Sequence, residues 1–250
     1  MARIGLMLYT VRGECSRDLE ATLRAVAAMG YEGVELFSLH GHDAERVRAW
    51  LDECGLAACA RHADLESIET RLPELAQEAA ALGTPRLILS WIEPPGSIQE
   101  ARATVDRLTS AARRAAGLGL QLGFHNHDGE LRPLAGARSF LDELLGVPRE
   151  LLFLELDLGW AWYAGTDPLA LLDRARGRCP LVHVKDFRTP GERSFCPVGD
   201  GAVGYERVAP AAVRAGVEWL LVEQDETEGP ALDAARRSLA ALLGMLEDAA

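Results

Sequence analysis

The sequence lacks the long apolar segments, cysteine pairs and basic clusters that mark several classes of protein. No run of about 18 apolar residues occurs, and the start MARIGLMLYTVR passes into polar sequence without an A-x-A cleavage pattern. We therefore expect a cytoplasmic protein with no membrane partner. The five cysteines are odd in number and show no CxxC spacing, so neither a disulfide framework nor a thiolate zinc site is indicated. A net charge of −12 without a Lys/Arg cluster argues against a nucleic-acid partner.

Phosphate-binding glycine loops are also missing. The first expected strand-to-helix turn, LMLYTVRGECS, has no G-x-G-x-x-G pattern, and no Walker glycine run occurs, which argues against a doubly wound nucleotide-binding sheet. The 250 residues are 48% hydrophobic and 26% charged, and a barrel of alternating strands and helices commonly fills such a length. Because no linker or low-complexity tract divides the chain, we expect one domain over residues 1–250.

One unit recurs along the chain: a helical stretch, a glycine and a short apolar run. The glycine can take the left-handed conformation that ends a helix, and the partly β-branched run favours a strand. These helix-ending glycines are Gly30, Gly55, Gly83, Gly119 and Gly216. The expected strands are residues 4–9, 33–37, 57–62, 86–91, 121–127, 152–158, 181–186 and 219–225. Eight parallel strands with helical crossovers predict an α/β fold of the closed (β/α)8 TIM-barrel type.

Capping residues agree with this alternation. Ser97 with Glu100 has the spacing of a capping box, and Asp167 precedes a proline at an expected first turn. Ser16, with Asp18 and Glu20, is predicted to open the first helix, and Ser67 is predicted to open the third.

Polar residues gather where the expected strands end, which is the edge that builds the active site of such a barrel. They include Glu35, Arg61, His62, His125, Asn126, His127, Asp128, Glu130, Glu155, Asp157, His183, Lys185, Asp186, Glu223, Gln224 and Asp225. Residues two apart on a strand share a face, so His125 and His127 are expected to point the same way, with Phe124 facing the helices. We therefore expect the polar set to point into the barrel mouth.

Carboxylates and imidazoles that converge in a partly dry pocket need a neutralising cation, because burying unpaired charge is costly. One divalent metal ion meets this need, and mixed nitrogen and oxygen ligation suits Mn²⁺, Co²⁺, Zn²⁺ or Mg²⁺. The alternatives are that His183 is a core histidine bonded to a backbone carbonyl and that Asp157 and Glu223 form ion pairs inside the barrel.

Several segments resemble the xylose-isomerase-like TIM-barrel superfamily of sugar phosphate isomerases and epimerases. They are GLMLYTVR, MGYEGVEL, GFHNHDGE, ELDLGWA with AGTDPLALL, PLVHVKD, VGDGAVGYE and LLVEQDE. The resemblance covers essentially the whole chain and is closest to the YHNH-type branch, in which tyrosine stands at the position of Phe124. Tagatose 3-epimerases, inosose dehydratases and endonuclease IV belong to the same superfamily.

The resemblance implies one divalent metal ion as cofactor, bound by one residue from each of the last four strands. The ligands that it implies are Asp157, His183, Glu223 and, at the position of the usual strand-five glutamate, His125. His127 and Glu130 stay open as alternatives to His125. Endonuclease IV has a histidine where this chain has Trp160, and its additional zinc ligands have no evident counterparts, so a three-metal nuclease site is not expected.

The activity that the resemblance implies is isomerisation or epimerisation of a sugar, keto-sugar or cyclitol through an enediolate, with the metal as Lewis acid. Glu223 is expected to move the proton, with Lys185, His127 and Glu130 as candidates for the second acid or base. A lysine beside a metal is expected to have a depressed pKa, although it could instead pair with a carboxylate such as Asp186 or Glu155.

The expected partner is a small carbohydrate substrate. Substrate contacts are expected from His62, Trp91, Trp160 and Asp225, because aromatic faces at strand ends often stack on sugar rings, although such residues also simply pack the barrel top. The glycine-rich segment VGDGAVGYE could offer backbone amides to an anion or hydroxyl group. The family further suggests a homodimer.

Three other functions fit parts of the pattern. A lyase that eliminates water or a glycosyl group from a keto-substrate, as in the inosose dehydratases, is the main alternative, since histidines replace the usual strand-five glutamate. An endonuclease is disfavoured by the acidic charge. A metal-binding or sugar-binding protein without turnover would keep the ligands and lack a working acid/base pair.

Overall fold

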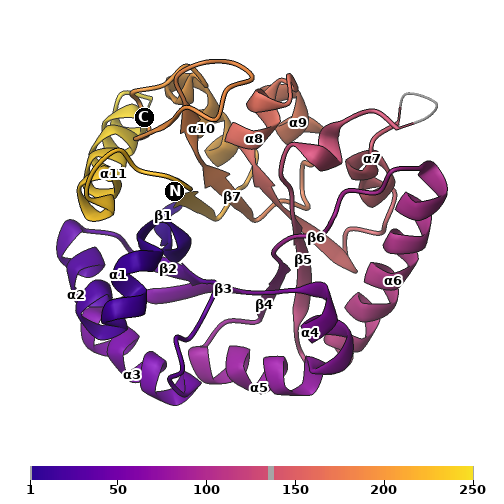
Figure 1. Ribbon diagram of the computed structural model, residues 1–250, viewed down its shortest axis with the longest axis horizontal. Helices are drawn as coiled ribbons and strands as arrows, with labels where there is room; N and C mark the ends of the chain where they lie inside the picture. The colour runs from indigo at the N-terminus through magenta and orange to yellow at the C-terminus, as the bar shows by residue number, and fades with distance from the viewer. Residues whose placement is uncertain (1, 135–137, 250) are drawn as a thin grey trace.

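The predicted barrel is confirmed. The computed structural model describes residues 2–134 and 138–249, and eight parallel strands in them close in the order β1, β10, β7, β6, β5, β4, β3, β2. The barrel strands are β1 (Arg3–Met7), β2 (Gly33–Leu36), β3 (Ala57–Ala63), β4 (Arg86–Leu89), β5 (Gln121–His125), β6 (Leu152–Asp157), β7 (Leu181–Val184) and β10 (Trp219–Val222). Figure 1 shows these strands at the centre of the molecule and the helices around them.

Helical segments connect the strands. The longer helices are α2 (Leu19–Met29), α3 (Ala44–Cys54), α5 (Leu72–Leu82), α6 (Ile98–Gly117), α10 (Tyr205–Arg214) and α11 (Ala231–Glu247). The shorter ones are η1 (Leu8–Val11), α1 (Arg12–Arg17), α4 (Leu65–Thr70), η2 (Gly129–Leu131), α7 (Phe140–Leu145), α8 (Leu158–Tyr163) and α9 (Pro168–Arg174). Strands β8 (Asp186–Phe187) and β9 (Phe195–Cys196) form a small antiparallel pair after β7. None of the described helices is both long and apolar enough to cross a membrane.

Most barrel strands end one to three residues earlier than predicted. His127, Lys185 and Asp225 therefore lie in the connections that follow β5, β7 and β10 rather than on the strands themselves. The polar residues at these ends leave the backbone ladder because the barrel opens there into its loops. Strand β3 alone runs one residue further than predicted, to Ala63.

The predicted helix ends are confirmed, and the predicted helix starts are confirmed in part. All five glycines have left-handed φ angles, between 69° and 104°. Ser97 accepts a hydrogen bond from Glu100 N at 3.2 Å, and Asp167 accepts one from Leu169 N at 2.9 Å. The carboxylate of Glu100 bonds to Gly96 N rather than to Ser97 N, so the capping box is only half formed.

Two predicted caps are wrong. Ser16 lies inside α1, and Asp18 caps α2 by accepting a hydrogen bond from Ala21 N. Ser67 lies inside α4, whose cap is Asp64. In each case an aspartate stands close by, and its carboxylate competes successfully for the free amides of the first turn.

Two apolar clusters account for the core. The larger lies between strands and helices and contains the outward residues of the alternation, such as Phe124, Leu156 and Val222, as predicted. The smaller, which we call the barrel plug, fills the amino-terminal half of the barrel. It consists of Cys59, Ala60, Ile88, Phe153, Leu181, Trp219 and Leu221. Polar side chains therefore occupy the interior only towards the carboxyl ends of the strands.

Candidate functional site

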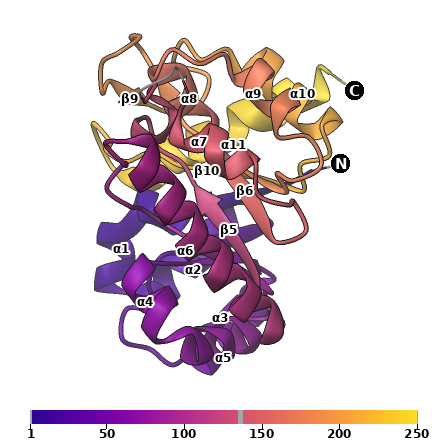
Figure 2. The same ribbon diagram turned by 90° about the vertical axis from the view of Figure 1, so that its right-hand side faces the viewer.

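A cavity of about 670 Å³ opens at the carboxyl ends of the barrel strands. Aromatic residues in its wall include Tyr9, Phe37 and Trp91, and segments after several different strands contribute to it. Three of these segments, α1, α4 and β9, lie on the same side of the barrel in Figure 2. The polar residues that line the cavity include Arg12, Arg61, His62, Asp64, Arg71, His125, His127, Asp128, Arg193, Glu223, Asp225 and Glu226. Its volume falls within the range of small-molecule sites.

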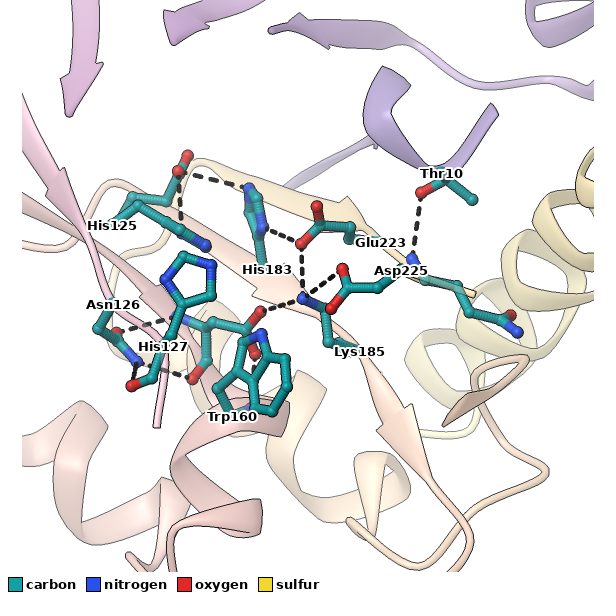
Figure 3. A network of polar contacts seen from close by, with 12 residues as sticks. Thr10, His125, Asn126, His127, Trp160, His183, Lys185, Glu223 and Asp225 are labelled. Atoms are coloured by element: carbon teal, nitrogen blue, oxygen red, sulfur yellow. Dashed lines mark hydrogen bonds and ion pairs between the residues drawn. The ribbon is translucent and has the colours of Figure 1, made fainter. Parts of the chain in front are cut away.

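Four side chains from consecutive strands meet beside this cavity, and we call them the upper cluster. They are His125, Asp157, His183 and Glu223, and each offers one ligand atom within 4.8 Å of the others. His125 and Glu223 line the cavity, whereas Asp157 and His183 lie deeper and have no exposed surface. This is the set of residues that the sequence assigned to a metal, and Figure 3 shows three of them around the end of β7.

Local structure holds Asp157 at the end of β6. Its backbone N–H donates to the Asn126 side chain at 3.1 Å, and its carboxylate caps α8 by accepting a hydrogen bond from Trp160 N at 2.7 Å. A side chain at Gly159 would collide with the carbonyl oxygen of Lys185, so glycine is needed where α8 crosses the end of β7. The segment ELDLGW therefore does two things. It holds the carboxylate of Asp157 in place, and its glycine lets α8 pack closely against the end of β7.

Lys185 departs from the expectation. Its Nζ contacts three carboxylates, those of Asp157 at 3.0 Å, Glu223 at 2.9 Å and Asp225 at 2.9 Å, as Figure 3 shows. Burial alone would lower the pKa of Lys185, but these carboxylates outweigh it and raise the pKa above its ordinary value. This raised pKa belongs to the metal-free chain, whereas the depressed pKa was expected for a lysine beside a bound metal. The side chain is 1% exposed, and it pairs with neither Asp186 nor Glu155.

The two strand-five histidines are neutral bases. Burial, with the neighbouring imidazole of His183, lowers the pKa of His125 to about 4. Burial, with His125 next to it, lowers the pKa of His127 to about 2. Both imidazoles therefore keep a nitrogen lone pair at neutral pH, which metal ligation or proton acceptance requires.

Glu130 lies away from the cavity. It is 1% exposed, is not among the residues that line the cavity, and accepts a hydrogen bond from His127 N at 2.9 Å. Burial raises its pKa to about 7. Glu130 therefore lies beneath the turn that follows β5, where it holds the backbone of His127. It does not face the cavity in which a substrate would bind.

The four expected substrate contacts all line the cavity: His62, Trp91, Trp160 and Asp225. Trp91 is 54% exposed, so its ring face is open to the cavity mouth. Trp160 is buried, and its Nε1 makes no hydrogen bond with any residue that the structure describes. An indole N–H left over in this way is available to a ligand hydroxyl.

Glu35 and Glu155 complete a second group that the sequence did not identify. With His62 and His183 they form what we call the lower cluster, nearer the barrel plug, and one ligand atom of each lies within 4.8 Å of the others. Burial and its neighbour Glu155 raise the pKa of Glu35. Burial would lower the pKa of His62, but Glu35 and Glu155 outweigh it and raise it to about 9.

Backbone amides of the glycine-rich loop after β7 already donate hydrogen bonds to a side chain of the protein. Asp186 accepts hydrogen bonds from the backbone N–H groups of Gly199 at 3.0 Å, Gly201 at 3.2 Å and Val203 at 3.2 Å. The amides that could have received an anion or hydroxyl are thus used internally. This loop is folded around Asp186 and does not contribute to the residues that line the cavity.

The upper cluster suits a divalent cation. It combines two imidazoles with two carboxylates, the mixed nitrogen and oxygen set that transition metals and Mn²⁺ accept. Nδ1 of His125 is buried and makes no hydrogen bond within the described residues; the nearest carboxylate oxygen, from Glu155, is 3.3 Å away. Burial raises the pKa of Asp157 to about 6, although Lys185 opposes the shift. A cation at this position would satisfy the imidazole nitrogen and favour the ionised carboxylate.

Fold and site together define a known class of protein. The family described as xylose isomerase-like TIM barrel matches residues 23–245, so the chain belongs to that family. Solved structures with this fold include a sugar phosphate isomerase/epimerase from Parabacteroides distasonis ATCC 8503, with a TM-score of 0.85 and 19% identity over 97% of this chain and 98% of that one. An L-ribulose 3-epimerase has a TM-score of 0.76 and 18% identity over 100% and 96% of the two chains.

Curated relatives are more similar in sequence. The rhizopine catabolism protein MocC of Rhizobium meliloti is 28% identical over 83% of this chain and 75% of its own length. An inosose dehydratase of Geobacillus kaustophilus HTA426 is 26% identical over 83% of this chain and 80% of its own length. The structural neighbours and relatives thus include isomerases, epimerases and dehydratases.

Proposed function

We propose that the protein is a metal-dependent isomerase or epimerase that removes a carbon-bound proton next to the carbonyl group of a sugar, keto-sugar or cyclitol. The observation that carries this proposal is the upper cluster, in which four donors from four strands meet at the wall of a cavity. A divalent ion bound there, Mn²⁺, Co²⁺, Zn²⁺ or Mg²⁺, would supply Lewis-acid stabilisation of the enediolate charge.

Glu223 is the proposed base. Burial would raise the pKa of Glu223, but Lys185 and His183 outweigh it and hold the pKa well below its ordinary value. The carboxylate is therefore ionised, and it lines the cavity. The contact with Lys185 fixes its orientation, which lowers the cost of placing it against a substrate C–H bond.

His127 is the proposed second acid or base. Its neutral imidazole lines the cavity, and Nδ1 makes no hydrogen bond within the described residues. It can therefore accept a hydrogen bond from a substrate hydroxyl, which is the geometry that proton transfer to it would need. Lys185 is kept from this exchange by its three carboxylates and acts by holding Asp157 and Glu223.

Recognition of the substrate is assigned to the cavity wall. Trp91 offers an exposed ring face, and Trp160 offers its free indole N–H. His62 and Asp225 add polar contacts on the same cavity. An aromatic face together with several hydrogen-bonding groups suits a ring that carries hydroxyl groups.

Elimination is the second candidate. It shares proton removal with isomerisation, but the enediolate then expels water or a glycosyl group from the adjacent carbon. Two observations favour it: the curated relatives include inosose dehydratases, and strand five presents His125 where a second carboxylate would serve an epimerase. Glu130 does not supply that carboxylate, because it lies away from the cavity.

Proton exchange tests the shared step. The purified protein, loaded with Mn²⁺, is incubated in D₂O with a panel of ketoses, inososes and 3-keto-glycosides and followed by proton NMR. We expect loss of the proton next to the carbonyl of at least one compound, abolished by a chelator. A new ketose or epimer then identifies isomerisation, whereas an absorbing enone identifies elimination.

A matched pair of variants tests whether the upper cluster carries out proton removal. Glu223→Gln is expected to lower the exchange rate at least 100-fold, whereas Glu226→Gln, at the same cavity but outside the cluster, is expected to change it by less than about threefold. Equal effects of the two substitutions would contradict Glu223 as the base. No exchange into any compound, with metal retained, would support a binding protein without turnover.

A further inference from the structure

The lower cluster is an ionisable layer where barrels normally hold branched apolar side chains. Glu35, Glu155 and His183 have no exposed surface, and His62 is 2% exposed. Residues two positions earlier on the same strands, such as Phe153 and Leu181, belong to the barrel plug, so the layer lies directly on an apolar floor. Two carboxylates in such a place need a partner that neutralises them.

The four donor atoms form a closed ring in which nitrogen and oxygen alternate. Nε2 of His183 lies 2.6 Å from Oε2 of Glu35 and 3.4 Å from Oε2 of Glu155. Nε2 of His62 lies 3.2 Å and 3.0 Å from the same two oxygens. Ligands roughly 2.0–2.2 Å from a tetrahedral Zn²⁺ stand roughly 3.3–3.6 Å apart, so small shifts would open this ring around one ion.

Two oxygens of the layer are left without a hydrogen bond. Oε1 of Glu35 and Oε1 of Glu155 are buried, and neither accepts a hydrogen bond from the described residues. Hydrogen bonds inside the ring therefore do not account for the whole donor set. A cation bound to the Oε2 atoms would neutralise both carboxylate groups and so lower the cost of burying their unpaired Oε1 atoms.

The charges of the two clusters also favour a second cation. The two clusters hold four buried carboxylates, and the charge of Lys185 is offset by a fifth carboxylate outside them, that of Asp225. With the other imidazoles neutral and His183 as the imidazolate that binding two ions requires, two divalent cations leave one negative charge on the two clusters, against four without a cation. His183 can serve both ions, because its Nδ1 faces Glu223 at 2.8 Å while its Nε2 faces Glu35.

We propose that Glu35, His62, Glu155 and Nε2 of His183 form a second divalent-cation site, of the tetrahedral Zn²⁺ or Co²⁺ type, below the proposed catalytic ion. The proposal rests on the proposed function only in sharing His183 with it. When both nitrogens of that imidazole bind metal, the ring has released its N–H proton to solvent. The ion enters from the cavity, since His62 lines it.

Metal stoichiometry tests the site. Chelator-stripped full-length protein is equilibrated with excess Zn²⁺, freed of unbound ion by gel filtration and assayed for zinc by elemental analysis. We expect two equivalents per chain for the wild type and for the control His42→Gln, because the His42 ring lies outside both clusters and meets Trp50 edge to face. One equivalent is expected for His62→Gln and one for Asp157→Asn.

The outcomes separate this proposal from the proposed function. One equivalent in the wild type, unchanged by His62→Gln, overturns the second site and leaves the upper site standing. No zinc in the wild type overturns both. Anomalous diffraction from a zinc-loaded wild-type crystal decides the question even where a variant fails to fold, because two peaks flanking His183 are expected and a single peak on the Glu223 side contradicts the proposal.

Discussion

Nζ of Lys185 lies 2.9 Å from Oε2 of Glu223, and the same oxygen lies 2.8 Å from Nδ1 of His183. One carboxylate oxygen thus links the ammonium group to the imidazole of a proposed metal ligand. Lys185 is also the only lysine in the chain, in which arginine supplies every other basic side chain apart from histidine. A compact ammonium fits among three carboxylates in a space where the planar guanidinium of arginine would not.

Because the carboxylates raise the pKa of Lys185, we predict that its Nζ stays protonated from pH 5 to pH 10 in the metal-free protein. Protein labelled with ¹⁵N-lysine gives a single Nζ signal, since no second lysine exists, and its chemical shift reports the protonation state. A shift that changes near neutral pH would instead support a lysine that exchanges protons during turnover.

Replacing Lys185 by methionine tests its structural role. The substitution keeps the unbranched chain up to Cε and leaves Asp157 and Glu223 buried without their cation. The free energy of unfolding in a chelator is therefore expected to fall by about 3–5 kcal/mol. Added Mn²⁺ is expected to recover more stability in this variant than in the wild type. Urea unfolding with and without metal measures both effects, and a loss under about 1 kcal/mol would contradict them.

The close approach of α8 to β7 predicts a large effect of one methyl group. Gly159→Ala would push against the carbonyl carbon and Cβ of Lys185 as well as the carbonyl oxygen, so we expect a loss of at least about 2 kcal/mol in the free energy of unfolding. Gly244→Ala in α11 is the control, because, apart from the adjoining backbone of its own helix, no described atom lies within 4 Å of the added carbon. There we expect a gain of about 0.5–1 kcal/mol. Similar results at both positions would contradict the close contact.

We predict that Glu130 makes a pH-dependent contribution to the free energy of unfolding. Burial raises the pKa of this carboxyl from an ordinary 4.5 to about 7, so the folded state binds the proton more tightly than the unfolded state. The contribution of Glu130 is therefore most favourable below about pH 4.5 and is lost as the pH rises through about 7, a change of about 3 kcal/mol. Glu130→Gln is expected to remove this change, as urea unfolding at pH 5 and pH 8 would show. An unaltered pH dependence in the variant would contradict it.

The barrel could be predicted because its signals are local. A helix, a glycine and a short apolar run recur at five places along the chain, and the left-handed φ angles of Gly30 and Gly216 confirm that these glycines end helices. Strand ends were less accurate, since polar residues such as His127 and Asp225 fit a strand by alternation but lie beyond the last backbone pair. Helix caps depend on which of several neighbouring side chains accepts the hydrogen bond from a free amide of the first turn. The sequence alone does not determine which side chain this is.

Topology alone predicted that the polar strand ends meet at the barrel mouth. The choice of the four residues of the upper cluster came from the family resemblance. The lower cluster was missed for a physical reason. Glu35 is a single acidic residue in an apolar strand, and its partner His183 lies 148 positions away, so only the closed barrel brings them together. The partners of Lys185 were missed for the same reason, since three carboxylates from β6 and the end of β10 surround it in place of Asp186 or Glu155.

The most direct measurement is an anomalous difference map from a crystal soaked in Mn²⁺. We predict a peak about 2.0–2.3 Å from one atom each of His125, Asp157, His183 and Glu223. The same peak should be lost in the Asp157→Asn variant. Absence of a peak among these four side chains, in a crystal whose soak saturates the protein in solution, would contradict the metal centre on which the proposed chemistry depends.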